Sequence, residues 1–407
     1  MSGKIAYILS RFPKISETFI LREINALQNE GWEIELYPLM LEKEKVVHPE
    51  AAPWLKRLHH FPWISGDVIR ANLRYFFRSP FGYLGLWGKI VLGNGSNPKF
   101  LARALVIFPK ALRMAEEMQR SGIQHIHAHF ATHPALTAWL IHHITGISYS
   151  VTVHAHDIYV SQTMLAEKMR TASFIIAISE FNRNFLIKHI GTEIKEKIKV
   201  VHCGIDLNTY KSRDEAPPHA KFQLKSIGSL EDYKGMSYLI KACALLVKQK
   251  IPLDCEIIGR GKNRHQLEAL IQKHHLEKTV FLVGAKTQKE VAEALSEADC
   301  YVQPSIITKT GKMEGIPVSI MEALGSGLPV VASDISGISE LIRTHETGYL
   351  VPEKNPEALA DTLVSIFQNL QEARVLAKNG RKLVEKEYDL SKNSARVAHL
   401  FEEFLNQ

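Results

Sequence analysis

The chain has 407 residues, 45% of them hydrophobic and 23% charged, which is enough sequence for two substantial hydrophobic cores. No window reaches the roughly 20 consecutive apolar residues of a membrane span, and the start MSGKIAYILSRFP lacks the segments of a signal peptide. We therefore expect a cytoplasmic protein. Four scattered cysteines without C-x-x-C spacing argue against a disulfide framework and against a cysteine zinc site. The net charge of +7 arises in residues 1–205, which hold 24 Lys and Arg against 16 Asp and Glu.

In residues 1–207, short β-branched runs alternate with amphipathic segments, which is the pattern of βαβ units and a parallel sheet. Ser16 is expected to begin a helix in which Ile20, Ile24 and Leu27 share one face. Strands are expected at 4–10, 33–39, 125–130, 148–153, 174–179 and 198–206, with further helices near 109–121 and 134–145.

Residues 54–113 interrupt this pattern with ten Lys or Arg, one acid (Asp67) and eleven aromatic residues. Cations combined with interfacial aromatic rings suit an anionic membrane surface or an anionic lipid-linked substrate. A helical insertion whose aromatic residues fill a core of its own explains the composition equally well. On the membrane interpretation, neutralising Arg70, Arg74 and Arg78 abolishes binding to liposomes. Nucleic acid is not expected as a partner, because no nucleic-acid-binding motif accompanies the basic residues.

A polar, proline-containing stretch at 208–221 is the expected linker, and the alternation then starts again. Strands are expected at 222–230, 253–259, 279–284, 300–305 and 347–352, with helices at 236–249, 263–275, 288–297, 356–369 and 390–406. The predicted fold class is α/β, with two Rossmann-like domains, 1–207 and 222–385, that face a cleft. A C-terminal helix within 386–407 is expected to cross back to the first domain. In such sheets, ligands bind beyond the carboxyl ends of the strands.

The stretch MEGIPVSIMEALGSGLPVV places two carboxylates on either side of a helix start. Pro317 suits the first helical position, so we expect a helix from Pro317 to Leu324 with Glu314 in the loop before it. The unpaired N–H groups and the positive dipole end of such a helix bind anions, and Gly315 lets a ligand approach the backbone. With Glu322 further along the helix, the arrangement suits a sugar, a diphosphate and a ribose in a row. The alternative is that both acids are ordinary surface charges.

The segment EGIPVSIMEALGSGLPVV resembles the E-x7-E signature of the retaining glycosyltransferases of family 4 (glycosyltransferase group 1), which have the GT-B fold. The resemblance extends over nearly the whole chain. Its motifs follow the family's order: FPKISETFILREI, HAHFATHPA, YSVTVHAHDIY, ASFIIAISEFNRNFL, VHCGIDLNTY, GSLEDYKGMSYLI, IIGRGKNRHQLE and ETGYLVP. The Ser-Glu-Thr-Phe start and the His-Ala-His-Phe strand are most similar to the exopolysaccharide and colanic-acid-type branch.

The resemblance implies roles for residues of the second domain. Glu314 would contact sugar hydroxyls and position the donor, while Glu322 would hold the two ribose hydroxyls. Backbone groups of Gly315, Ile316 and Pro317 would lie beside the sugar and the phosphate.

The diphosphate site departs from the family pattern at one position. Ser229 stands where the family usually has an arginine, whereas Lys234 keeps the second cation that holds the diphosphate. The missing cation is expected to weaken catalysis, because stabilising the charge that develops on a leaving group is usually the largest catalytic effect. Lys309 or Lys312, in the loop before Glu314, is the candidate replacement.

On the first domain, His154 matches the family histidine that faces the donor sugar from across the cleft. It would hydrogen-bond sugar hydroxyls or stabilise the positive sugar of the transition state. The family's Gly-Gly loop after the first strand is replaced by RFPKISET, which leaves Ser16 and Thr18 as candidate acceptor or phosphate contacts. Asp157 is a further candidate and equally a structural cap.

Two other patterns are weaker. His125, His127 and His129 alternate on one strand face within residues 121–156, a spacing that can bind zinc. No further ligand occurs at matching spacing, so local polar packing is the preferred interpretation and no metal site is predicted. The motif GRGKNR is similar to the dinucleotide-binding G-x-G-x-x-G, but Arg264 replaces its third glycine.

Together these features predict a retaining glycosyltransferase that moves a hexose from a nucleotide diphosphate sugar to a lipid-linked or growing oligosaccharide in exopolysaccharide or cell-surface glycan synthesis. Because no Asp-x-Asp occurs, neither a metal nor another cofactor is expected. The insertion at 54–113 would place the protein on the inner face of the cytoplasmic membrane. A non-catalytic nucleotide-sugar-binding partner protein and a sugar-nucleotide epimerase of the same fold remain alternatives. The sequence does not determine the donor base, the sugar or the acceptor.

Overall fold

The computed structural model of the chain describes residues 3–14, 18–42, 49–212 and 219–405, which form two compact units. The first unit comprises Met1–Val201 with Ser394–Gln407, and the second comprises His202–Asn393. Within the described ranges, none of the helices combines the length and the apolar character needed to cross a membrane.

The first unit is built on a six-stranded parallel sheet with the order β2-β1-β3-β4-β5-β6. Its strands are β1 (Lys4–Phe12), β2 (Glu33–Leu41), β3 (His125–His129), β4 (Ser148–Val153), β5 (Phe174–Ala177) and β6 (Ile198–Val200). Its helices are α1 (Thr18–Asn29), α2 (Gly66–Arg78), α3 (Pro80–Asn94), α4 (Pro98–Arg120), α5 (His133–Thr145), α6 (His156–Tyr159), α7 (Leu165–Thr171), α8 (Glu180–Ile190) and α16 (Leu390–Leu405).

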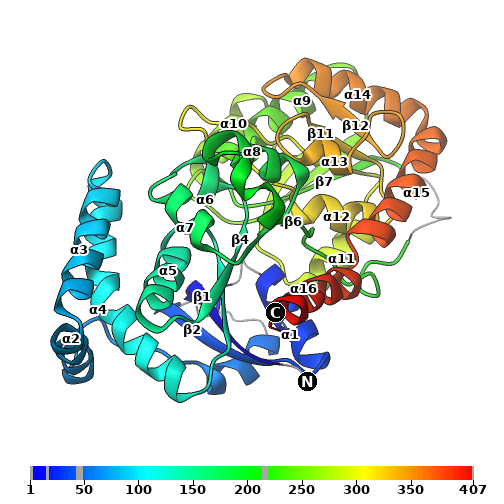
Figure 1. The fold of residues 1–407 in the computed structure, drawn as a ribbon. Helices are drawn as coiled ribbons and strands as arrows, with labels where there is room; N and C mark the ends of the chain where they lie inside the picture. The colour runs from blue at the N-terminus through cyan, green and yellow to red at the C-terminus, as the bar shows by residue number, and fades with distance from the viewer. Residues whose placement is uncertain (1–2, 15–17, 43–48, 213–218, 406–407) are drawn as a thin grey trace. The chain divides into compact units, whose positions relative to one another are not determined.

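Helices cover both faces of this sheet, as the pattern of alternating strands and helices requires. One face packs against α1 and the C-terminal helix α16 (Figure 1). Phe401 of α16 is fully buried there, with its ring centroid 5.6 Å from that of Trp32 and 6.4 Å from that of Tyr7. The other face carries α5, which in turn contacts α4. The C-terminal helix therefore completes the core of the first unit.

The insertion at 54–113 is largely helical, and α2, α3 and the start of α4 stand beside the sheet as a group of their own (Figure 1). Its inner aromatic rings pack together: the centroid of Phe108 lies 4.5 Å from that of Trp87 and 5.3 Å from that of Tyr83. Tyr83 also contacts Phe76 at 5.6 Å. Part of the aromatic content of the insertion thus forms a local core, as one of the two interpretations of the sequence proposed.

The second unit contains another six-stranded parallel sheet, with the order β12-β11-β10-β7-β8-β9. Its strands are β7 (Phe222–Ile227), β8 (Leu253–Ile258), β9 (Val280–Gly284), β10 (Cys300–Gln303), β11 (Val330–Ser333) and β12 (Tyr349–Val351). Its helices are α9 (Met236–Lys248), α10 (Arg264–Lys273), α11 (Gln288–Ser296), α12 (Val318–Gly325), α13 (Ile338–Leu341), α14 (Pro356–Gln368) and α15 (Leu370–Glu387). Successive strands are added outward from β7 on one side and outward from β10 on the other.

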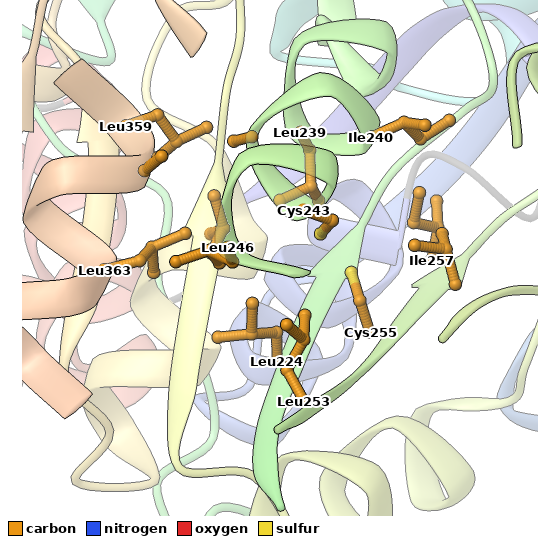
Figure 2. Packing of buried hydrophobic residues seen from close by; sticks show 14 of the residues in the cluster. Leu224, Leu239, Ile240, Cys243, Leu246, Leu253, Cys255, Ile257, Leu359 and Leu363 are labelled. Atoms are coloured by element: carbon orange, nitrogen blue, oxygen red, sulfur yellow. The ribbon is translucent and has the colours of Figure 1, made fainter. Parts of the chain in front are cut away.

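Each face of the second sheet has its own hydrophobic core. On one face, α9 and α14 pack over β7 and β8, and Figure 2 shows their side chains meeting there: Leu239, Cys243, Leu246, Leu359 and Leu363 above Leu224, Leu253, Cys255 and Ile257. On the opposite face, α12 packs against β10 and β11 and is covered by α15. This sandwich fixes α12, the helix that carries Glu322 and follows the loop of Glu314, against the sheet.

The predicted fold class, two parallel-sheet α/β units, is confirmed, but several boundaries differ from those expected, among them the following three. Strand β6 ends at Val200 rather than at 206. Helix α12 begins at Val318, because Pro317 adopts an extended conformation and is the N-cap instead of the first helical residue. Tyr210 lies within the predicted linker at 208–221, yet its side chain is fully buried in the second unit.

We predict that Phe401→Ala destabilises the first unit by about 3 to 5 kcal/mol, because it removes a fully buried aromatic ring from a packed core. Urea unfolding followed by tryptophan fluorescence measures this effect, since Trp32 contacts the ring. The control is Glu402→Ala, an exposed residue of the same helix. Equal unfolding midpoints for the two variants would show that α16 contributes little to this core.

Candidate active site

The predicted site residues of the second unit lie at the topological switch point of its sheet, on two loops and on the helix that follows one of them. One loop follows β7 and contains Ser229 and Lys234; the other follows β10 and leads through Glu314 into α12. β7 and β10 are neighbours whose connections leave in opposite directions, which makes the carboxyl ends of these two strands the topological switch point of the sheet. Open α/β sheets bind their ligands at such a point.

Glycines allow the neighbouring loops to pack closely at this edge of the sheet. At Gly259 (φ +154°) a Cβ atom would lie 1.8 Å from the carbonyl oxygen of Gly228, and at Gly261 one would lie 2.4 Å from that of Leu230. Asn263 extends the contact: its N–H donates to Leu230 and its side chain donates to Asp232 at 2.7 Å. The glycines of GRGKNR therefore pack this loop against the loop after β7, and this packing, rather than a dinucleotide site, accounts for them.

Gly235 joins the loop after β7 to the loop after β10. It has φ +67°, and a Cβ atom there would lie 1.7 Å from the carbonyl oxygen of Pro304. The N–H of Ile306 donates to the carbonyl of Tyr233 at 2.8 Å. The turn that carries Lys234 is thus fixed against the second loop before any ligand binds.

Lys234 and Glu314 form an ion pair between the two loops, with side chains only 11% and 12% exposed. Burial by itself lowers the pKa of Lys234, but attraction to Glu314, Tyr233 and Glu231 outweighs burial and raises the pKa above its ordinary value. Lys234 therefore remains cationic. An ammonium group has three donors, so it can bind phosphate oxygens while it still contacts Glu314.

A second cation, Lys312, lies beside this pair. Its Nζ atom is 4.2 Å from the ring centroid of Tyr233 and pairs with Glu231 at 2.5 Å. Lys234 Nζ is 5.5 Å from the same centroid, so the two lysines share one aromatic neighbour. The Tyr233 hydroxyl lies 3.2 Å from Ser229 Oγ, so the same tyrosine contacts both lysines and the residue that replaces the family's arginine.

Glu322 is held in place by a residue from a distant part of the chain. Its Oε1 atom accepts a 2.6 Å hydrogen bond from the Tyr210 hydroxyl, and both side chains are buried. The Ser336 hydroxyl donates to the carbonyl of Gly315 at 3.1 Å and so fixes the loop before the helix. A carboxylate that is oriented in this way can accept hydrogen bonds from adjacent hydroxyl groups of a ligand.

A buried polar network supports α12 from below. The Tyr301 hydroxyl donates to Gln303 Oε1 at 2.6 Å, and Ser319 Oγ of α12 donates to the same oxygen at 3.1 Å. Burial raises the pKa of Tyr301 far above its ordinary value, and the charges of Glu322 and Glu314 raise it further. Glu314 and Glu322, the two carboxylates of the MEGIPVSIMEALGSGLPVV stretch, thus act on one buried phenol, which keeps its proton.

His154 lies in the first unit, after β4, and is buried. Its N–H donates to Asp157, whose carboxylate also accepts from the N–H of Ala131 at 2.8 Å, so Asp157 caps this turn. Burial, with the neighbouring His129 and His156, holds the pKa of His154 well below its ordinary value. The imidazole is therefore neutral near pH 7.

A hydrogen-bonded chain assigns the tautomer of His154. The Tyr7 hydroxyl donates to the Glu23 carboxylate at 2.9 Å, and His129 Nε2 lies 3.1 Å from the same oxygen. In a neutral His129 whose Nε2–H donates to Glu23, Nδ1 is the acceptor toward His154 Nε2 at 3.2 Å. This leaves His154 Nδ1 as an acceptor, which suits a hydrogen bond from a hydroxyl group. Phe19, next to Thr18 at the start of α1, lies beside the ring of His154, with the ring centroids 4.8 Å apart and the ring planes tilted by 47°.

Alternating histidines of β3 form a ladder of hydrogen bonds with hydroxyl groups of the neighbouring strand β4. His125 contacts Ser148 and Ser150, and His127 contacts Ser150 and Thr152, all at 2.8 to 2.9 Å. Glu23, His127 and His129 bring three possible metal ligands within 4.8 Å of one another, but both ring nitrogens of His127 already bond to hydroxyl groups. The ladder supports the interpretation as local polar packing.

The structure therefore gathers most predicted site residues at one edge of the second sheet: Ser229, Lys234, Glu314, Gly315, Ile316, Pro317 and Glu322. His154 and Thr18 belong to the first unit, and Ser16 lies outside the described residues. The roles assigned to these residues stay predictions.

Sequence reasoning missed three residues that orient the others. Tyr233 precedes Lys234 in GSLEDYKG, and Glu23 lies within FPKISETFILREI. Their polar side chains inside recognised motifs could have marked both as candidate site residues. Tyr210 ends the motif VHCGIDLNTY, but nothing in that motif indicates its partner Glu322, which lies 112 positions away in the sequence.

Comparisons with known proteins follow the same two-part organisation. The family model "Glycosyltransferase Family 4" matches residues 16–209, and "Glycosyl transferases group 1" matches residues 209–383. The chain is 28% identical to WcaL of Escherichia coli (strain K12), a glycosyltransferase assigned to colanic acid biosynthesis, over 98% of this chain and 99% of that one. It is 36% identical to the amylovoran biosynthesis glycosyltransferase AmsK of Erwinia amylovora, over 51% of each chain.

Among solved structures, Anabaena HepE in complex with UDP has a TM-score of 0.72, with 98% of this chain and 100% of that chain covered. At 16% identity, this likeness concerns the fold alone.

We predict that Lys312→Met weakens the binding of UDP about tenfold, because one charge-assisted hydrogen bond is worth roughly 1.5 kcal/mol or more. Lys309→Met is the matched control, since Lys309 lies in the same loop but is exposed. Isothermal titration with UDP measures both. Equal losses for the two variants, or a loss only for Lys309→Met, would refute the assignment of Lys312 as the second cation.

Proposed function

Because the chain belongs to the glycosyltransferases of group 1 and family 4, we propose that it moves a hexose from a nucleotide diphosphate sugar to a lipid-linked or growing oligosaccharide, with retention of anomeric configuration. The observation that carries this proposal is the arrangement at the β7–β10 switch point. There Lys234 and Glu314 lie on two loops that pack tightly together, and Glu322 lies on helix α12, which follows the second loop.

The donor would occupy this point with its charged part between the two loops. Lys234, Lys312 and the N-terminal amides of α12 offer positive charge to a diphosphate without a metal ion. Glu322 would accept hydrogen bonds from the ribose hydroxyls, and Glu314 from hydroxyl groups of the sugar. HepE, which shares the fold, was solved with UDP, so UDP is the first nucleotide to test.

In the proposed reaction, the bond between the sugar and the diphosphate breaks while the acceptor hydroxyl attacks from the same face. The leaving diphosphate, stabilised by Lys234 and the start of α12, takes the proton of that hydroxyl, so no separate protein base is required. The neutral His154 would accept a hydrogen bond from a donor or acceptor hydroxyl through Nδ1.

The acceptor class is inferred from relatives and from the insertion. WcaL and AmsK are named for colanic acid and amylovoran biosynthesis, which supports a role in exopolysaccharide synthesis. Such polymers grow by successive sugar additions, and a lipid-linked chain is the acceptor that a basic, aromatic-rich insertion would suit.

The test is transfer of a labelled hexose from UDP-, GDP- or ADP-sugars to a lipid-diphosphate-linked sugar, with EDTA present. We expect one donor to be used, and NMR to show that the product keeps the donor's anomeric configuration. Lys234→Gln should lower kcat about 100-fold or more, the usual cost of losing one group that stabilises the leaving charge. Lys241→Gln, exposed on α9, is the matched control.

Other outcomes would decide against parts of the proposal. An inverted product contradicts retention, and loss of turnover in EDTA contradicts metal independence. Nucleotide binding without transfer of any donor favours the non-catalytic binding protein. Conversion of the sugar nucleotide without an acceptor favours the epimerase.

A further inference from the structure

The helical insertion has two surfaces of different character. The inner one is the aromatic core around Tyr83 and Phe108. The outer one carries large apolar side chains that no described residue covers: Phe81 is 90% exposed, Leu92 85%, Ile64 82% and Phe77 76%. Single exposed apolar residues are ordinary on protein surfaces, but a concentration of them on adjoining helices marks an interaction site.

The outer face of α3 is apolar along its length. Phe81, Leu84 and Leu92 recur at helical spacing, and Gly85 and Gly88 lie between them on the same side. A Cβ atom built at either glycine meets nothing within 4 Å, so this face is open. Lys89 is the only charged residue of the helix. A helix of this kind presents a smooth apolar strip rather than a set of polar contacts.

Helix α2 adds basic residues next to a second apolar strip. Ile69, Leu73 and Phe77 follow one another at intervals of four and are all exposed. Arg70, Arg74 and Arg78 follow at the same interval, one position further around the helix. The insertion as a whole has ten Lys or Arg and a single acid, Asp67, so its charge is strongly one-sided.

We propose that this outer face, formed by α2 and α3, docks on an anionic phospholipid bilayer, with Phe77, Phe81 and Leu92 among the acyl chains and the arginines at the headgroups. Charge complementarity selects this occupant: apolar strips flanked by cations match the interface of an anionic membrane. A second copy of the chain would bring two basic faces together, and their repulsion would oppose association.

Docking on a membrane would bring the enzyme to a lipid-linked acceptor, and this benefit, unlike the docking itself, rests on the proposed function. Binding to lipid can be measured without any donor or acceptor.

The experiment is vesicle flotation of the full chain, with vesicles of equal parts phosphatidylethanolamine and phosphatidylglycerol compared with phosphatidylcholine alone. We expect binding to the anionic vesicles, weakened by added salt. Phe81→Asp with Leu92→Asp should weaken it by about tenfold or more. Arg70→Gln with Arg78→Gln should cost about fivefold per charge. Val375→Asp, which removes an apolar side chain that is 59% exposed on α15, is the control and should bind as the wild type does.

Three results would overturn the proposal: no binding to anionic vesicles, unchanged binding of the Phe81→Asp, Leu92→Asp variant, or a dimer in light scattering that this variant dissociates. UDP binding, measured on the same samples, separates this proposal from the proposed function. Vesicle binding without nucleotide binding contradicts only the proposed function, and nucleotide binding without vesicle binding contradicts only the membrane face.

Discussion

The close packing of two loops at the β7–β10 switch point is the constraint on which the site depends. Gly235, with positive φ, lies against the backbone of Pro304, and the N–H of Ile306 is bonded to the carbonyl of Tyr233. Lys234 lies between Tyr233 and Gly235 in the sequence, so contacts of the neighbouring backbone fix the position of its Cα atom. Preorganisation of this kind lets a cation stabilise leaving-group charge without rearranging during the reaction.

Pairing of lysines with carboxylates is the second theme of the site. Two cations lie next to Tyr233, and each is paired with a carboxylate: Lys234 with Glu314, and Lys312 with Glu231. The carboxylates offset the positive charge of the two lysines. Buried or partly buried cations need such partners, because desolvation without them is costly. The same pairing gives Glu314 a fixed position from which it can bind sugar hydroxyls. Lys312, with its Nζ atom 4.2 Å from the ring centroid of Tyr233, is the cation that we expect to compensate for the serine at position 229.

The fold and most of the donor site could be predicted from sequence because their signals are local. Strand and helix periodicity located β7, β10 and α12, and the spacing of Glu314 and Glu322 around Pro317 indicated an anion site at a helix start. Tyr210 could not be predicted, because its contact with Glu322 depends on tertiary packing between residues far apart in sequence. The glycines of GRGKNR illustrate the opposite case: the pattern was visible, but only the structure shows that the loop after β7 occupies the space beside them.

Calorimetric titration of UDP, in EDTA, into wild type and Glu322→Gln tests the donor site most directly. We expect UDP to bind the wild type and the substitution to weaken binding about tenfold or more, because hydrogen bonds to a charged acceptor are worth roughly 1.5 to 3 kcal/mol. Glu293→Gln, an exposed carboxylate of α11, should bind as the wild type does. Equal affinities for wild type and a correctly folded Glu322→Gln would contradict the placement of a nucleoside diphosphate at this switch point.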